Sequence, residues 1–142
     1  MKIKPIILDR ITTKHTNYVV DLQLESNVTF ITGDSGTGKS AVYSFLQEYS
    51  SEDKRVRCFN YLDNNKQYRK TIKASKGKLF VIDNADILLD DNMRRYIATD
   101  SENQYIIIGR NPTGLFLAHD EIYELSNERE GNITCFNLIN AF

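Results

Sequence analysis

Several features are scarce or missing in this chain of 142 residues, and each absence argues against a kind of protein or a kind of site. No apolar run approaches about 18 residues, so we expect no membrane-spanning helix. The N-terminal residues run into a strand-like segment without a long apolar signal core, which indicates a cytoplasmic protein. Repeats, low-complexity segments and Cys/His clusters with metal-ligand spacing are absent. Cys58 and Cys135, the two cysteines, lie in strand-like runs, and we expect buried free thiols rather than a disulfide.

What is present fits one globular domain over residues 1–142, with 41% hydrophobic and 26% charged residues. The net charge of −1 hides an asymmetry. Residues 54–78 contain nine Lys or Arg and one acid, whereas residues 79–130 contain eleven acids and four Arg. The basic stretch predicts either a solvated face or a surface that contacts the phosphates of nucleic acid or of a substrate.

The most informative stretch is residues 28–40, in which an apolar run leads into Gly, four residues, and Gly-Lys-Ser. This pattern predicts a rigid strand, a loop whose backbone N–H groups bind phosphate, and a helix that points its positive end at the same anion. The recurrence of Val42, Phe45, Leu46 and Tyr49 indicates the buried face of that helix. The predicted phosphate-binding residues are Gly33, Asp34, Ser35, Gly36, Thr37, Gly38, Lys39, Ser40 and Ala41.

On these residues the sequence resembles the phosphate-loop NTPase superfamily. The resemblance implies that the chain binds ATP with Mg²⁺. It also implies that Lys39 reaches the β and γ phosphates and that the Ser40 hydroxyl ligates the metal.

A second motif is the run Leu79 to Ile82 followed by Asp83, which resembles the Walker B strand of that superfamily. Asp83 is then expected to hold Mg²⁺ through water, opposite Ser40. The hydrolytic branch usually has Glu next, but here the residue is Asn84, which orients water without accepting its proton. Slow turnover is therefore expected. Asp86 is the nearest carboxylate for a general base, unless it only caps a helix or turn.

The segment before the loop is expected to form two strands, 3–8 and 17–24, joined by a turn at 11–16. An antiparallel entry of this kind resembles ATP-binding-cassette and chromosome-segregation-type ATPases. In the cassette family an aromatic residue on the entry ribbon stacks on adenine. The resemblance therefore makes His15 or Tyr18 a candidate for that role, the alternative being that Tyr18 only packs in the sheet.

Further strands are expected at 56–61, 104–108, 121–125 and 133–139, the last as an antiparallel edge strand after a turn at 126–132. A turn is expected at 63–65, and residues 66–78 are expected to form a short helix or a mobile loop.

Asp90 and Asp91 predict the capped start of an amphipathic helix, with Arg94 and Arg95 away from its buried face. Arg110 and Asn111 follow the strand at 104–108, where the family resemblance implies a γ-phosphate sensor. Asn111 with Pro112 also predicts the start of a short helix.

Together these elements predict an α/β phosphate-loop NTPase core of three layers, with a mostly parallel sheet, an N-terminal antiparallel ribbon and a C-terminal β-hairpin. The resemblance best fits the branch with an additional strand and a catalytic acid, without a signature motif or a helical lid. The expected function is a slow ATPase or ATP-driven switch that acts on a protein partner or a second copy. The alternatives are a small-molecule or nucleotide kinase and a nucleic-acid-associated ATPase.

Overall fold

The computed structural model describes residues 3–33, 38–63 and 67–142. The strands are β1 (Arg10–Lys14), β2 (Tyr18–Gln23), β3 (Val28–Thr32), β4 (Val56–Phe59), β5 (Leu79–Ile82), β6 (Gln104–Ile108), β7 (Ile122–Glu130) and β8 (Ile133–Asn140). The helices are α1 (Lys39–Ser50), α2 (Tyr68–Ala74), α3 (Ala85–Leu88) and α4 (Asp91–Thr99), with short 3₁₀ turns η1 (Tyr61–Asp63) and η2 (His119–Glu121).

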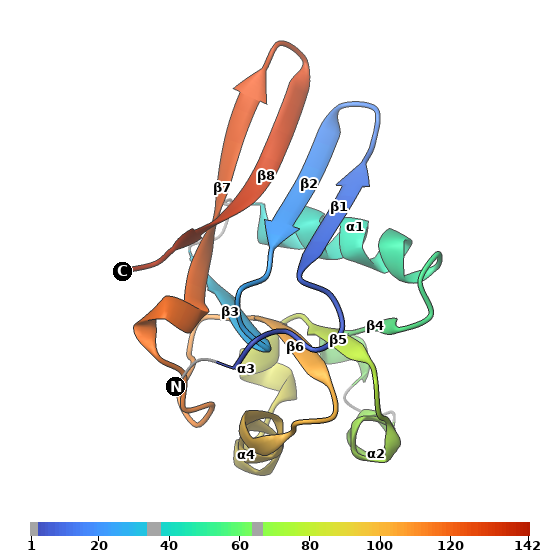
Figure 1. Cartoon of the computed structure of the whole chain (residues 1–142), viewed down its shortest axis with the longest axis vertical. Helices are drawn as coiled ribbons and strands as arrows, with labels where there is room; N and C mark the ends of the chain where they lie inside the picture. The colour runs from blue at the N-terminus through green and yellow to red at the C-terminus, as the bar shows by residue number, and fades with distance from the viewer. Residues whose placement is uncertain (1–2, 34–37, 64–66) are drawn as a thin grey trace.

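All of these strands belong to one sheet, in the order β1-β2-β8-β7-β3-β6-β5-β4 (Figure 1). Five of its seven strand pairings are parallel, and the two antiparallel pairings are β1 with β2 and β7 with β8. The predicted mixed α/β architecture with a mostly parallel sheet is therefore confirmed. Strand β6 separates β3 from β5, so the strand before the loop and the strand that ends at Asp83 are not neighbours.

Alternate residues of the parallel strands enter two separate cores, one on each face of the sheet. Phe30, Phe80 and Ile107 face the core that contains buried residues of α2, α3 and α4. Ile31 and Val81 face the other core, which contains the buried face of α1. This division follows from the period of two in a strand and gives helices on both faces of the parallel part of the sheet.

The N-terminal ribbon is an antiparallel pair as expected, but its first strand was predicted in the wrong place. Residues 3–8 are not a strand, and β1 starts at Arg10 and continues through residues 11–14, which the sequence assigned to the turn. The reason is that backbone groups of this segment form hydrogen bonds with a buried side chain instead of with a neighbouring strand. The Gln104 side chain accepts from the backbone N–H groups of Ile7 and Leu8, each at 2.9 Å, and donates to the Leu8 carbonyl at 2.8 Å.

The C-terminal hairpin also differs from expectation. Strand β7 continues to Glu130 through residues assigned to the turn, and only Gly131 and Asn132 connect it to β8. Gly131 adopts φ 60°, which suits the first position of a two-residue hairpin turn. Strand β8 is not an edge, because β2 pairs with it in parallel on its other side. The sheet edges are β1 and β4.

Two predictions in the helical segments are confirmed and two are wrong. Residues 66–78 contain the helix α2 rather than only a loop. Asp90 caps α4 by accepting from the Met93 backbone N–H at 2.8 Å.

In contrast, Arg94 is buried at 6% exposure and does not lie on an outer face. No helix starts at Asn111 in the described part of the chain, because its side chain closes a turn onto Thr113 instead. The predicted turn at 63–65 lies mostly outside the described residues.

Candidate functional site

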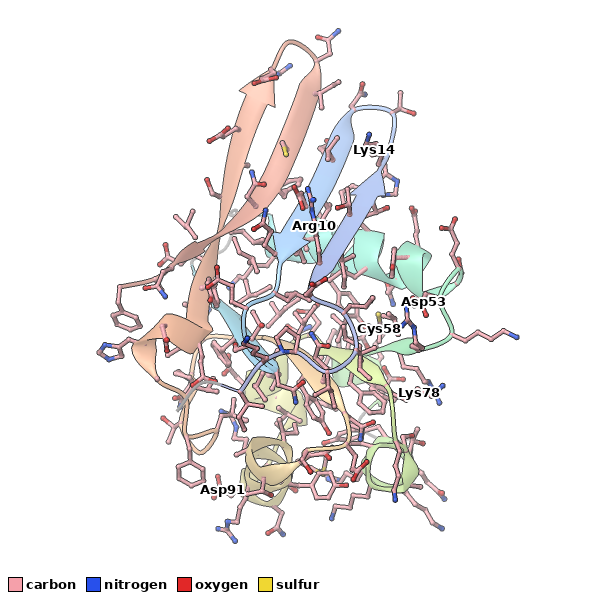
Figure 2. All side chains as sticks on the ribbon, in the orientation of Figure 1. Arg10, Lys14, Asp53, Cys58, Lys78 and Asp91 are labelled. Atoms are coloured by element: carbon pink, nitrogen blue, oxygen red, sulfur yellow. The ribbon has the colours of Figure 1, made fainter. Side chains whose placement is uncertain are left out.

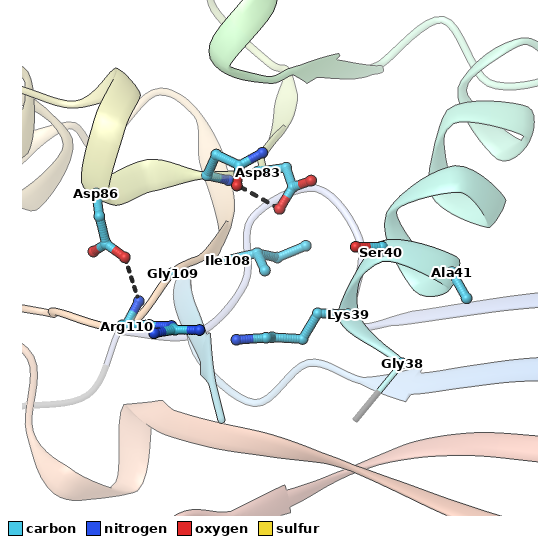
Figure 3. A pocket seen from close by; sticks show the side chains of 10 residues that line it. Gly38, Lys39, Ser40, Ala41, Asp83, Asp86, Ile108, Gly109 and Arg110 are labelled. Atoms are coloured by element: carbon cyan, nitrogen blue, oxygen red, sulfur yellow. Dashed lines mark hydrogen bonds between the residues drawn. The ribbon is translucent and has the colours of Figure 1, made fainter. Parts of the chain in front are cut away.

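A cavity of about 400 Å³ lies at the carboxyl ends of β5 and β6, next to the N-terminus of α1 (Figure 3). This is the edge of a parallel sheet where ligands of open α/β folds bind. Its lining residues are Gly38, Lys39, Ser40, Ala41, Asp83, Asn84, Asp86, Ile108, Gly109 and Arg110. The fold thus brings together residues predicted from three separate segments of the sequence.

Lys39 is the first residue of α1, and its ammonium group donates to the carbonyl oxygen of Gly33. The first turn of α1 carries no acidic residue, so no side chain there offsets the positive end of the helix dipole. Gly33 and Gly38 adopt φ 130° and 99°, conformations that favour glycine, as predicted. Residues 34–37, the middle of the predicted phosphate loop, lie outside the described residues.

Phe136 of β8 lies against Gly38, at the start of α1, and sequence reasoning did not identify it. A Cβ atom on Gly38 would lie 2.5 Å from the Phe136 ring, so this position needs glycine for space as well as for φ. No pattern linked these two residues, which come together only because β8 enters the sheet between β2 and β7. The C-terminal hairpin therefore supports the end of the predicted phosphate loop.

Asp83 directly follows β5 and is half-buried at the cavity. Burial raises the pKa of Asp83 above its ordinary value, while the Asn84 backbone N–H, at 2.9 Å, and the charge of Lys39 act in the opposite direction. In Figure 3 the Ser40 hydroxyl and the Asp83 carboxylate lie on the same side of the cavity. A hydroxyl and a carboxylate are hard oxygen ligands of the kind that Mg²⁺ accepts.

Asn84 lines the cavity and is one of two described non-glycine residues with positive φ, at 52°. Asn is among the few residues that tolerate this left-handed conformation. The backbone at this position therefore favours Asn over the Glu of the hydrolytic branch.

The two sensor candidates differ in position. Arg110 is exposed and lines the cavity, and Figure 3 shows its side chain extending toward Lys39 from the opposite side. Asn111 does not line the cavity as described. Its side-chain oxygen instead accepts from the backbone N–H and the hydroxyl of Thr113, at 3.0 and 2.5 Å.

Neither adenine-stacking candidate lines the cavity in the described structure. His15 stacks on Phe45 with ring centroids 4.1 Å apart, and its Nδ1 lies 3.2 Å from a carboxylate oxygen of Glu48. Tyr18 is 41% exposed and lies beside Phe136, with ring centroids 6.1 Å apart. Since Phe136 contacts the position of Gly38, Tyr18 is the better placed of the two for a base bound next to the loop.

The basic stretch covers β4 and α2, at the sheet edge away from the ribbons. Part of its charge is compensated. Arg55 bonds both oxygens of Asp53, and Arg69 pairs with Asp90 at 3.2 Å. Figure 2 shows Asp53, Cys58 and Lys78 in the same region, and the Lys78 ammonium donates to the carbonyl of Lys54 at 3.1 Å. Short charged strands of this kind protect a sheet edge from pairing, and contact with nucleic acid stays a prediction.

Both cysteines are free, as predicted, but each is half-buried rather than fully buried. Burial raises the pKa of the Cys58 thiol to about 12, which disfavours the nucleophilic thiolate.

Residues 3–33, 38–63 and 67–142 include no group of three or more His, Cys, Asp or Glu arranged to hold a metal ion. Within the same residues, every helix is too short or too polar to cross a bilayer. No family model matches the chain, and neither the curated proteins nor the solved structures contain a match.

Proposed function

We propose that the protein binds Mg-ATP in this cavity and acts as a slow ATPase or ATP-driven switch on a partner. The observation that supports this is the convergence of Lys39, Ser40, Asp83 and Arg110 around a space of about 400 Å³. Two cations suit a polyphosphate. The hydroxyl of Ser40 and the carboxylate of Asp83 suit a metal that keeps most of its ligands as water and phosphate oxygens.

The sheet order also favours this proposal over an unrelated α/β fold. The parallel strands run β7-β3-β6-β5-β4, with β6 between the strand that precedes the loop and the strand that ends at Asp83. One inserted strand at this place is what a branch defined by an additional strand implies. When bound, Mg²⁺ would neutralise charge on the phosphates. The chain's own contribution is to hold the phosphates with Lys39 and Arg110 and to orient water with Asn84.

The kinase alternative needs the basic stretch to act as a lid over the cavity. Helix α2 instead packs into the core through Tyr68 and Ile72, and the Tyr68 hydroxyl donates to the Leu88 carbonyl at 2.5 Å. Among the residues that the structure describes, none from α2 lines the cavity. We therefore favour the switch over the kinase.

Binding is tested with Lys39→Ala, measured by calorimetry with Mg-ATP. Loss of one charge-assisted contact is expected to weaken affinity roughly 10-fold to 100-fold. Lys14→Ala, an exposed lysine on β1, is the matched control and is expected to bind like the wild type. Equal affinities for the wild type and Lys39→Ala would refute the proposal.

Slow turnover is tested with Asn84→Glu, which supplies a general base beside Asp83. Such a base typically contributes about 100-fold or more, so phosphate release is expected to rise by roughly that factor. Some gain will be lost because Glu tolerates the left-handed backbone less well than Asn. Asn84→Gln matches Glu in size without its charge and is expected to give no increase. A wild-type rate near 10 per second, common for enzymes, would show that Asn84 is no handicap.

A further inference from the structure

Two charged side chains outside the phosphate loop hold the segment that follows β6, residues 109–114. The first is Asp86 of α3. One of its carboxylate oxygens accepts from the Arg110 backbone N–H at 2.8 Å, and the other accepts from the Asn111 backbone N–H at 3.0 Å. A carboxylate that bonds two successive N–H groups fixes the direction of the backbone between them.

The second is Arg94 of α4, which approaches the same segment with its guanidinium group. Its Nη1 donates to the carbonyls of Asn111 and Thr113, at 2.6 and 2.8 Å. Its Nη2 lies 3.6 Å from Asp86 Oδ1, and Nε donates to the Leu89 carbonyl at 3.4 Å. Arg94 is 6% exposed, and a charged group buried to this extent is unfavourable unless its donors are used. Two of its hydrogen bonds are made to this segment.

Two glycines lie where the segment meets the clamp formed by Asp86 and Arg94, Gly109 in a tight space and Gly114 at a positive φ. A Cβ atom on Gly109 would lie 3.2 Å from Asp86 Oδ1 and 3.3 Å from the Ala85 Cβ. Gly114 has φ 84°, and a Cβ there would lie 3.5 Å from the Arg94 stem. The start of the segment, at Gly109, is therefore fitted closely to Asp86.

From this arrangement we infer that Asp86 and Arg94 are positioning residues that hold Arg110 in the cavity, facing Lys39. Asp86 fixes the backbone of Arg110, and Arg94 fixes the next turn and pairs with Asp86. The inference rests on the proposed function, because the ligand that Arg110 would meet is the terminal phosphate of a nucleoside triphosphate. Asp86 then acts through Arg110 and gives the site its preference for triphosphate over diphosphate.

The test compares the affinities for Mg-ATP and Mg-ADP in the wild type, Asp86→Asn, Arg110→Ala and the double variant. Asp86→Asn is isosteric and turns one acceptor of the clamp into a donor. It is expected to reduce the ATP-over-ADP preference roughly tenfold, by about the same factor as Arg110→Ala. The double variant is expected to lose no more than either single one, because both act through one contact.

Asp90→Ala is the matched control, since it removes the cap of α4 without touching the clamp. It is expected to lower stability while the ATP-over-ADP preference stays unchanged. If Asp86→Asn keeps the preference and abolishes only phosphate release, Asp86 is a general base and the inference is wrong. Independent, additive losses in the double variant would also overturn it.

Hydrogen exchange separates this inference from the proposed function, because it needs no nucleotide. The amides of Arg110 and Asn111 are expected to exchange faster in Asp86→Asn than in the wild type, and at the wild-type rate in Asp90→Ala. A wild-type protein that binds neither nucleotide would refute the proposed function. Unchanged exchange in Asp86→Asn would refute the clamp itself.

Discussion

The parallel strands β3, β5 and β6 and the two antiparallel ribbons, β1–β2 and β7–β8, share a sheet but are buried very differently. Every residue of β5 and β6 is buried, and so is every residue of β3 except its last. In β8 only Phe136 is fully buried, and the last five residues of β7 are exposed or half-buried. Helices cover both faces of the parallel part, whereas the ribbons extend beyond them (Figure 1).

The parallel strands and the ribbons therefore contribute differently to the candidate site. The enclosed strands give rigid carboxyl ends, and from these ends Asp83 and Arg110 reach the cavity. The ribbons add little to the cavity lining but support it from outside, through the contact of Phe136 with the position of Gly38. Fewer side chains of the ribbons are buried in a core, so the ribbons are expected to open locally at a lower free energy than the parallel strands.

The largest effect is expected when a buried side chain of the parallel part is truncated, in comparison with a partly exposed side chain of the ribbons. Phe30→Ala in β3 removes a fully buried ring and is expected to lower the free energy of unfolding by about 3–5 kcal/mol. Ile139→Ala in β8 truncates a side chain that is 48% exposed and is expected to change it by less than about 1 kcal/mol. Urea denaturation measures both. Similar losses would mean that the ribbons are as tightly packed as the parallel strands.

An intermediate effect is expected at the contact between the two parts. Gly38→Ala places a Cβ against the Phe136 ring at a φ of 99° and is expected to destabilise the protein by roughly 1–3 kcal/mol. Phe136→Leu in the same chain removes the clash and is expected to recover part of that loss, but not the part due to backbone strain. Thermal or urea unfolding of the two single variants and the double variant gives the coupling. Strictly additive losses would show that Phe136 does not support the loop.

The smallest effect on the free energy of unfolding is expected at Asp83. Substitution there is expected to stabilise the protein rather than destabilise it. Because burial raises the pKa of Asp83, the folded state binds this proton more tightly than the unfolded chain does. The ionised group therefore costs stability at neutral pH, and the cost fades as the pH falls through the raised pKa toward the ordinary value.

Asp83→Asn is thus expected to be slightly more stable than the wild type at pH 7 without nucleotide, with a gain that shrinks in acid. The same variant is expected to lose the part of ATP affinity that depends on Mg²⁺. Unfolding curves at several pH values test the first statement, and calorimetry with and without Mg²⁺ tests the second. A variant less stable than the wild type at pH 7 would contradict the sign.

The same contrast explains what the sequence could predict. Apolar runs such as Leu79 to Ile82 predicted the parallel strands because a strand buried on both faces has few polar residues. The helix capped by Asp90 and the residues Lys39, Ser40, Asp83 and Arg110 followed from local patterns. The β1 boundary did not, since residues 6–8 are apolar and strand-like. Their backbone N–H groups bond instead to the side chains of Asn27 and Gln104, which are distant in the sequence.

The clamp and the Phe136 contact were also missed, for a related reason. Arg94 precedes Ile97 by three positions and so shares its helix face, which was a usable signal. Its charge, however, predicted an exposed position. Its partners include the backbone carbonyls of a segment 17 to 19 residues away. Such partners leave no pattern in the sequence.

The most direct test of the account is a crystal structure with Mg²⁺ and a non-hydrolysable ATP analogue. We predict phosphate oxygens within hydrogen-bonding distance of the Lys39 ammonium and the Arg110 guanidinium. Mg²⁺ is predicted on the Ser40 hydroxyl, with Asp83 joined to it through water. A nucleotide bound elsewhere, or a cavity that stays free of phosphate at saturating analogue, would contradict the account.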